Sequence, residues 1–399
     1  MVLVGCYSLI KFPKTSWSIT ELDLGETAIE EVPPAIESLG KLVVLRLDNC
    51  RRLKNLPSST CNLTSLTELE LHGCSNITKF PDISGDMKYL SLSETAIEEL
   101  PSSVECLTEL TVLRLQKCKR LKRVSSSICK LKSLEILYLF GCSKLEGLPE
   151  ILESMERLET LYLAGTPIKE LPSSIDHLPQ LSLLSLENCK NIFGFPNSFF
   201  NLRSLSSLNL SGWSGVDKLL ENLPLALLSG LCSLTELHLN DCNLLELPSA
   251  LTCLSSLEIL GLSGNIFESL NLKPFSCLTH LNVSYCKRLQ SLQEFPSPLR
   301  LVNLQAHECI YLETVPASAD VEFTVSWSSQ QYFTFFNCWK LNENAHENIL
   351  ADARLRIQFM ATNAQGTMSM EDYMEVSFCF CLSFSHLSLS LSLSLFLYI

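Results

Sequence analysis

The stretch Leu131–Pro149, LKSLEILYLFGCSKLEGLP, shows in full a pattern that recurs throughout this chain of 399 residues. Its Cys142 marks a position that Cys, Thr or Asn occupies in almost every copy. Successive copies are 21 to 24 residues apart, except for one interval of 29 residues. The copies are centred on Cys6, Thr27, Cys50, Cys74, Thr95, Cys118, Cys142, Thr166, Cys189, Trp213, Cys242, Asn265, Cys286 and Cys309. A period this short predicts a stack of similar small units rather than several globular domains.

Each copy follows the pattern of a leucine-rich repeat, L-x-x-L-x-L-x-x-N/C-x-L. The L-x-L pair, such as Leu137 and Leu139, alternates with the period of a strand, so successive pairs should stack into one parallel sheet. A Leu148-Pro149 pair then turns the chain away, because proline fixes φ and removes a hydrogen-bond donor. The predicted fold class is therefore α/β: a leucine-rich-repeat solenoid (horseshoe) over residues 1–316, with a concave parallel β-sheet and short convex helices or turns.

The composition favours a protein partner. There are 30 Lys and Arg against 43 Asp and Glu, a net charge of −13. This balance argues against nucleic-acid binding, because that affinity comes from Lys and Arg. The sequence contains no phosphate-binding, nucleophile-elbow or zinc-protease motif, and its seven histidines lack metal-ligand spacing. We therefore expect no enzymatic activity, no cofactor and no metal.

The chain contains eighteen cysteines, and nine of them occupy the repeated polar position as small side chains that we expect to be buried. In-register parallel strands lie about 4.8 Å apart. Neighbouring thiols such as Cys118 and Cys142 would therefore fall near disulfide distance in an oxidising environment. We expect all eighteen thiols to be free and the protein to occupy a reducing compartment, the cytoplasm or the nucleus.

Both ends of the chain differ from the repeats between them. Met1 already lies on the first repeat's strand, which predicts a longer parent protein because solenoids need a polar terminal cap. After Pro316 the repeat wording stops, and residues 317–380 carry strand-like aromatic stretches and a helical pattern, which predict the start of a β-rich domain. Residues 381–399 form a Leu/Ser tail that we interpret as disordered or as translated non-coding sequence. Its length fits a membrane anchor, but its alternating serines do not.

Binding residues are expected on the concave sheet, where the residue between the two leucines of each strand and the residue after the second leucine face solvent. Tyr138, Phe140 and Tyr162 would form an aromatic patch on two adjacent repeats, and Tyr and Arg dominate binding hot spots. The candidate protein-binding face consists of Arg46, Arg114, Lys117, Tyr138, Phe140 and Tyr162. The alternative is an ordinary solvated face with incidental aromatic residues.

A second candidate surface is basic. Residues 114–132 hold eight basic residues and no acidic one, in a chain whose net charge is −13. The candidate docking stripe consists of Lys119, Arg120, Lys122 and Arg123. Such a stripe predicts docking of an acidic partner or of an acidic neighbouring domain, with a merely solvated surface as the alternative.

The repeat wording resembles that of a known family. Gly141-Cys-Ser in the opening stretch and Glu94-Thr-Ala-Ile-Glu-Glu-Leu-Pro101 resemble the repeats of plant intracellular immune receptors of the TIR, nucleotide-binding, leucine-rich-repeat family. Phe335-Phe-Asn-Cys-Trp-Lys-Leu-Asn342 resembles the opening of that family's C-terminal jelly-roll/Ig-like domain, which would be truncated in this chain.

This resemblance implies a recognition module for plant defence. It would sense a pathogen effector or a guarded host protein, contact the receptor's own nucleotide-binding domain, and regulate receptor activation and signal transduction. Motifs of the family's NAD-cleaving TIR domain and nucleotide-binding domain are absent from this sequence, so the resemblance assigns no enzymatic residue.

Three other classes remain open at this point. An extracellular leucine-rich-repeat receptor or inhibitor would favour Ile-Pro turns, flanking cysteine pairs and a signal peptide, none of which is present. A bacterial repeat-bearing ubiquitin ligase would favour repeats of about 20 residues. A generic adaptor or scaffold differs from an immune sensor only in its partner.

Overall fold

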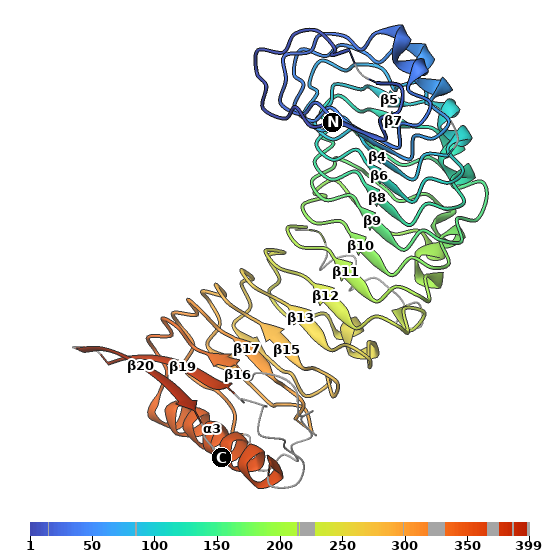
Figure 1. The fold of residues 1–399 in the computed structure, drawn as a ribbon. Helices are drawn as coiled ribbons and strands as arrows, with labels where there is room; N and C mark the ends of the chain where they lie inside the picture. Colours follow the sequence, from blue (N-terminus) through green and yellow to red (C-terminus); the bar gives the residue numbers. More distant parts are fainter. Residues whose placement is uncertain are drawn as a thin grey trace. The chain divides into compact units, whose positions relative to one another are not determined.

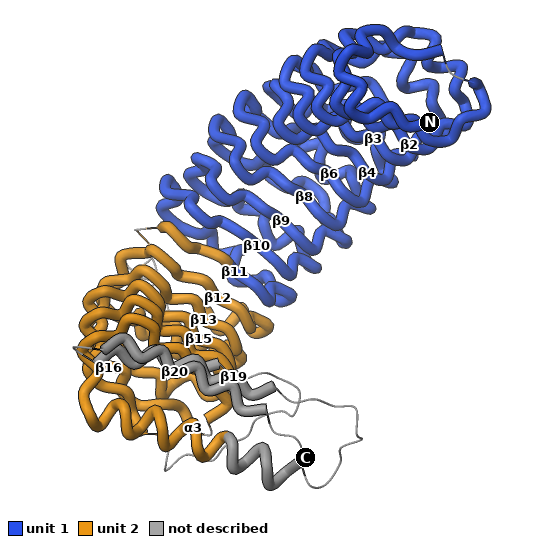
Figure 2. Tube along the Cα trace, turned by 60° about the vertical axis from the view of Figure 1, so that its left-hand side comes forward, with its two compact units in different colours: residues 1–208 blue, residues 209–399 orange. Residues whose placement is uncertain are grey.

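The computed structural model of this chain describes residues 1–14, 16–83, 86–213, 215, 228–297, 299–317, 332–364, 375–384 and 387–396. For residue 332 and for residues 357 onward it describes the backbone only. The chain divides into two compact units, Met1–Leu208 and Asn209–Ile399 (Figure 2). Each unit is described by itself.

The first unit is built on a parallel sheet of three-residue strands, one from each repeat after the first (Figure 1). In chain order the strands are β1 (Glu21–Asp23), β2 (Val44–Arg46), β3 (Glu68–Glu70), β4 (Tyr89–Ser91), β6 (Val112–Arg114), β8 (Ile136–Tyr138), β9 (Thr160–Tyr162) and β10 (Leu183–Ser185). Their central leucines pair in register, as Leu113 does with Leu137, and are buried. The residues flanking each central leucine form one open face of the sheet. The predicted leucine-rich-repeat solenoid is confirmed.

The strand β11 (Ser207–Asn209) contains the boundary between the units. The second unit continues the same pattern with parallel strands paired in register. They are β12 (Glu236–His238), β13 (Ile259–Gly261), β15 (His280–Asn282), β17 (Asn303–Gln305) and β18 (Tyr332–Thr334). The sheet therefore extends beyond Pro316, where the repeat wording stops, because β18 adds a further strand beside β17.

In about half of the repeats a short 3-10 helix lies on the side opposite the sheet, and Figure 1 shows several of them along that edge. They are η1 (Pro34–Ser38), η2 (Ser58–Asn62), η3 (Ser102–Cys106), η4 (Ser126–Lys130), η5 (Ile175–His177), η6 (Asn197–Asn201) and η7 (Ser249–Cys253). Proline itself occupies the N-cap in most of them, as Pro57 and Pro101 do with extended φ and ψ. A serine caps η4, where the Ser125 hydroxyl accepts a hydrogen bond from the Ser127 N–H.

Two-residue strands pair between neighbouring repeats beside the main sheet. They are β5 (Glu99–Leu100) with β7 (Arg123–Val124), and β14 (Ser269–Leu270) with β16 (Ser291–Leu292).

Buried cysteine at the repeated Cys/Thr position ties its repeat to the one before it. The Cys142 thiol donates to the Leu115 carbonyl oxygen across 3.1 Å, and the Cys338 thiol makes the same contact with the carbonyl of Ala306 across 2.8 Å. Threonine works differently, because the Thr95 hydroxyl donates to the carbonyl of Leu92 in its own repeat. Burial raises the pKa of the Cys142 thiol to about 12, which keeps it a neutral donor. The sixteen cysteines with described side chains are free thiols.

The residue before this position has a positive φ in every described repeat, between 54° and 76°. These residues are Gly5, Glu26, Asn49, Gly73, Glu94, Lys117, Gly141, Gly165, Asn188, Gly212, Asp241, Gly264, Tyr285, Glu308 and Asn337. Glycine is favoured where a neighbouring side chain also fills the space: a Cβ on Gly73 would lie 2.3 Å from Asn49 Oδ1. The recurring Gly-Cys pair therefore marks the left-handed turn that follows each strand.

The helix α3 (Glu343–Ala364) packs on the last repeats of the second unit through Ala345, Ile349 and Ala353. Its Arg356 is almost fully buried, forms an ion pair with Asp352 at 2.7 Å and donates to the Leu301 carbonyl oxygen at 2.7 Å. The helical pattern predicted after Pro316 is thus a helix that covers the end of the core.

The C-terminal tail has regular backbone structure in its described part. The strand β20 (Leu387–Phe396) pairs antiparallel with β19 (Glu375–Phe384). Alternating Leu and Ser has the period of a strand. The interpretation of residues 381–399 as disordered or as translated non-coding sequence stays a prediction. The strand-like stretch at 321–327 lies outside the described residues, so the division into a separate domain at 317–380 stays a prediction.

Candidate functional site

Three of the expected binding residues form an aromatic cluster on the open face of the first unit. Tyr138 at the end of β8 pairs in register with Tyr162 at the end of β9, and their rings stack with centroids 5.0 Å apart and planes 4° apart. Phe140 meets Tyr138 edge to face at 6.4 Å. All three side chains are half-buried, because they cover one another and the strands beneath. Stacked aromatic rings of this kind offer a rigid apolar surface with two hydroxyl groups.

Arg114, at the end of β6, continues this column on the other side of Tyr138. Its guanidinium carbon lies 5.0 Å from the centroid of the Tyr138 ring and 5.6 Å from that of Tyr89. No described carboxylate forms an ion pair with Arg114, and its Nε is buried without a hydrogen-bond acceptor. The column Tyr89, Arg114, Tyr138 and Tyr162 therefore carries one charge that the described residues leave unneutralised.

The sequence reasoning missed Tyr89. It considered the residues after the central leucine of each strand, whereas Tyr89 precedes Leu90 and lies on the same open face as Ser91. The period of two residues places both flanking positions on one face, so this signal was present in the sequence. Burial raises the pKa of Tyr89 while Arg114 opposes the shift, so the phenol is neutral at pH 7.

Arg46 is not part of this cluster. On β2 it forms ion pairs with Glu21 at 2.5 Å, Glu68 at 2.7 Å and Glu70 at 3.4 Å. Burial alone would lower the pKa of Arg46, but its hydrogen bonds with Glu68 and Glu21 raise it overall. Its charge is therefore neutralised by the chain itself, which makes it a structural residue rather than an available anchor.

Lys117 also belongs to an internal pair. It occupies the left-handed turn after β6, and its Nζ lies 3.0 Å from Glu94 Oε1 of the preceding repeat. Both side chains are about half exposed, so this pair is weak and accessible to solvent.

The basic stripe divides into two pairs of residues. Lys122 and Arg123 form ion pairs with Glu98 at 2.9 Å and Glu99 at 3.8 Å. Lys119 and Arg120 are exposed and form no ion pair within the described part of the chain. The stripe therefore keeps free positive charge on the turn that follows Cys118.

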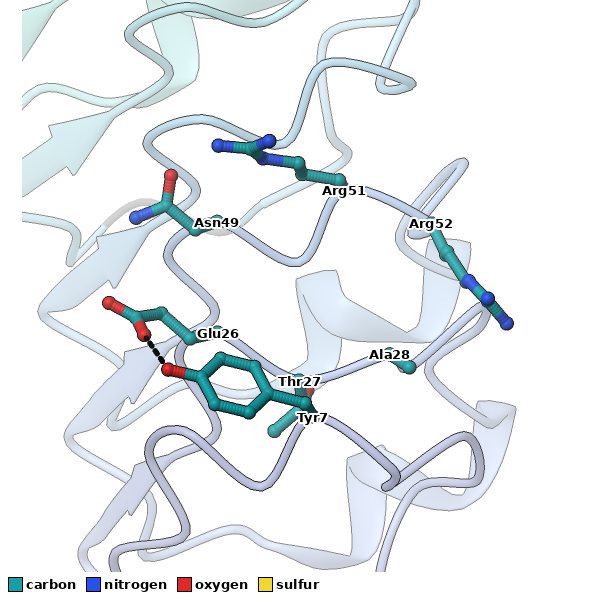
Figure 3. Close-up of a pocket in the computed structure, with 7 residues that line it drawn as sticks. All are labelled: Tyr7, Glu26, Thr27, Ala28, Asn49, Arg51 and Arg52. Atoms are coloured by element: carbon teal, nitrogen blue, oxygen red, sulfur yellow. Dashed lines mark hydrogen bonds between the residues drawn. The ribbon is translucent and has the colours of Figure 1, made fainter.

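A separate hollow lies at the N-terminal repeats (Figure 3). It has a volume of about 510 Å³ and is lined by Tyr7, Glu26, Thr27, Ala28, Asn49, Arg51 and Arg52. The Tyr7 hydroxyl donates to Glu26 Oε2 across 3.1 Å, and Figure 3 shows both side chains on one wall of the hollow. The sequence reasoning did not identify this site, because Tyr7 meets Glu26 only through the stacking of two repeats.

Known proteins share this architecture and this repeat pattern. Residues 130–338 match the family described as "Disease resistance protein RPS4B-like, leucine-rich repeats". The chain belongs to this family. The RPS4B-like match ends at Cys338, the same residue that makes the last thiol contact of the ladder. Residues 84–164 also match a general leucine-rich-repeat region.

Curated relatives of this RPS4B-like chain are plant disease resistance proteins. A probable disease resistance protein of Arabidopsis thaliana, At4g19520, is 34% identical over 94% of this chain and 22% of its own length. The disease resistance-like protein DSC1 of the same plant is 38% identical over 87% of this chain and 21% of its length. The chain thus spans about a fifth of these two relatives.

A solved structure shows the same fold. YopM, a leucine-rich effector protein from Yersinia pestis, superimposes with a TM-score of 0.55 at 24% identity, over 76% of this chain and 75% of YopM.

Within the described ranges of this RPS4B-like chain, His, Cys, Asp and Glu side chains nowhere gather in a group of three able to hold a metal ion. Among the same residues, no helix combines the length and apolar composition needed to cross a bilayer. The matching families are repeat families, and neither description includes a catalytic domain.

Proposed function

We propose that this chain is the recognition module of a plant immune receptor, and that the open face around Tyr138 and Tyr162 binds a pathogen effector or a guarded host protein. Binding there would regulate receptor activation. The observation that carries the proposal is the stacked tyrosine pair beside the unneutralised Arg114, within a repeat region of a disease resistance family. Aromatic and arginine side chains at the centre of a contact surface supply most of the binding free energy in protein complexes.

The proposed location is the cytoplasm or the nucleus. Buried thiols recur in successive repeats, as at Cys50 and Cys74, and stay free of disulfides in a reducing compartment. An extracellular receptor or inhibitor would expose this ladder to oxidation. Thiol labelling of protein isolated from plant cells and denatured without reductant should modify nearly all cysteines, and extensive protection would favour the extracellular alternative.

The basic stripe is proposed as a second contact, with an acidic partner or with the receptor's own nucleotide-binding domain. Lys119 and Arg120 supply the free charge, whereas Lys122 and Arg123 already pair with glutamates. Changing all four to Ser should weaken an association that is sensitive to salt. Unchanged binding at low salt would contradict this contact.

We also keep the jelly-roll/Ig-like interpretation of the residues after the repeats as a proposal. The support is limited to the sequence wording, because Tyr332–Thr334 and Cys338 belong to the repeat ladder in this structure. The proposed domain keeps the bounds 317–380, and its first described strand, Tyr332–Thr334, pairs with the sheet of the repeats.

The test of the main proposal is site-specific photo-crosslinking in plant cells. A benzoylphenylalanine at position 162 should cross-link a protein that mass spectrometry identifies and that binds the purified chain. The matched control places the same group at position 193, where Phe193 is an exposed aromatic residue away from the sheet face. Identical cross-linked proteins at both positions, or none at position 162 during infection, would count against recognition by the sheet. A partner of no immune role would favour the generic adaptor.

A further inference from the structure

Arg114 and Arg46 occupy the same position in their repeats but have opposite surroundings. Three carboxylates surround Arg46: Glu21 on β1, and Glu68 and Glu70 on β3. The strand register gives the residues at the equivalent positions around Arg114, which are Tyr89 on β4, and Ile136 and Tyr138 on β8. None of these three is acidic, so these positions supply no counter-ion to Arg114, whereas the equivalent positions supply three to Arg46.

The nearby carboxylates are already committed to other partners. Glu68, the register partner of Tyr89, is bound by Arg46, and Glu94 of the adjacent turn is bound by Lys117. Ser91, which pairs with Arg114 in the sheet, is buried and uncharged. The Nε of this half-buried guanidinium has lost hydration without gaining a hydrogen bond, which favours an incoming anion.

The geometry also indicates which anion fits. A planar guanidinium held between two rings presents its edge, which matches the two oxygens of a carboxylate. A phosphate carries nearly twice the charge and is usually bound by several cations. The column contains one unpaired cation, Arg114, because the nearby Lys117 is already paired with Glu94. The adjoining stack of Tyr138, Tyr162 and Phe140 suits an apolar side chain next to the acidic residue.

We infer that Arg114 binds an Asp or Glu side chain of the protein partner, with a neighbouring apolar residue of that partner against the Tyr138 and Tyr162 rings. This inference rests on the proposed function and specifies its partner: a peptide segment in which an acidic residue adjoins an apolar one. The surrounding sequence supports it electrostatically, because residues 114–132 are basic in a chain of net charge −13.

The test uses a phage library of random 12-residue peptides selected on the purified full chain. Peptides whose binding is lost in the Tyr138→Ala/Tyr162→Ala variant are kept, and their affinities are measured by fluorescence anisotropy. They should contain Asp or Glu, and changing that residue to Asn or Gln should weaken binding about 10- to 100-fold, as for a lost charge-assisted hydrogen bond. Arg114→Gln should weaken binding equally, and combining both changes should add little.

Two further variants keep the result interpretable. Arg114→Lys retains the charge but not the planar fork, so it should bind with intermediate affinity. Arg46→Gln makes the same chemical change at a neutralised arginine and should leave peptide affinity within about twofold, as expected for a residue outside the contact. Circular dichroism confirms that each variant is folded.

The contradicting outcomes separate the two proposals. Peptides that depend on Tyr138 and Tyr162 but lack acidic residues, or that bind Arg114→Gln unchanged, overturn the carboxylate inference and leave the proposed function standing. Failure to select any peptide that depends on the two tyrosines overturns both.

Discussion

The left-handed turn after each strand gives a sharp test of the repeat geometry. Gly141 has a φ of +73°, and a Cβ placed there would lie 3.1 Å from Lys117 Cγ. A non-glycine residue in this conformation costs about 1 to 2 kcal/mol, whereas replacing glycine gains about 0.4 to 1 kcal/mol through the unfolded chain. Gly141→Ala should therefore destabilise the protein by about 1 kcal/mol once the contact with Lys117 is included.

The same repeat provides the control. Gly147 lacks a positive φ, and a Cβ there would meet no atom within 4 Å. Gly147→Ala should therefore stabilise the protein by about 0.4 to 1 kcal/mol. Urea unfolding followed by circular dichroism should give midpoints that move in opposite directions, with Gly141→Ala lower by about 0.3 to 1 M for a slope of about 1 to 3 kcal/mol per molar. Equal midpoints for the two variants would refute the assigned turn.

Three further predictions concern buried and paired charges. Arg46→Gln should lower the free energy of unfolding by about 1 to 3 kcal/mol, because it removes three partly exposed ion pairs. Urea unfolding should show a smaller loss in 1 M salt, and a loss that does not depend on salt would contradict the ion pairs. Burial and Asp23 raise the pKa of Asp48 in the folded protein, so the folded state holds this proton more tightly. Asp48→Asn should therefore stabilise the protein at pH 7, and this added stability should shrink toward pH 4 as Asp48 becomes protonated in the wild-type protein. Thermal unfolding across this range would refute the reasoning if the added stability increased on acidification. Arg356→Met should lower the free energy of unfolding by about 3 to 5 kcal/mol, because Asp352 stays buried and loses its partner. Combining it with Asp352→Asn should recover much of this stability, as measured by resistance to limited proteolysis.

Much of the fold could be predicted because it depends on spacing alone. A pair such as Leu137 and Leu139 identifies one strand, and the recurring interval between repeats identifies the strands beside it. The same period predicts that Tyr138 lies beside Tyr162, as it does in the structure. The thiol ladder also followed from the period, since Cys142 returns to the same position as Cys118.

The rest depends on which side chains meet across repeats. Arg46 was expected to be an anchor, but its neutralisation requires knowing that Glu21 and Glu68, which precede the central leucines, share its face. The contribution of Tyr89 was missed for the same reason. The aromatic stretch that contains β18 was expected to be strand-like, but its place in the repeat sheet was not expected, because Phe333 replaces the usual leucine. Cys338 nevertheless keeps the position that ties this strand to the sheet.

The most direct test of recognition by the sheet face is the affinity of the cross-linked partner for the purified chain, measured by isothermal titration calorimetry. Tyr162→Ala should weaken binding at least about 30-fold, as expected for a hot-spot residue that contributes about 2 kcal/mol or more. Phe193→Ala, which removes an exposed aromatic ring elsewhere, should leave the affinity within about twofold. Equal affinities of the Tyr162→Ala variant and the wild-type chain would contradict the central claim.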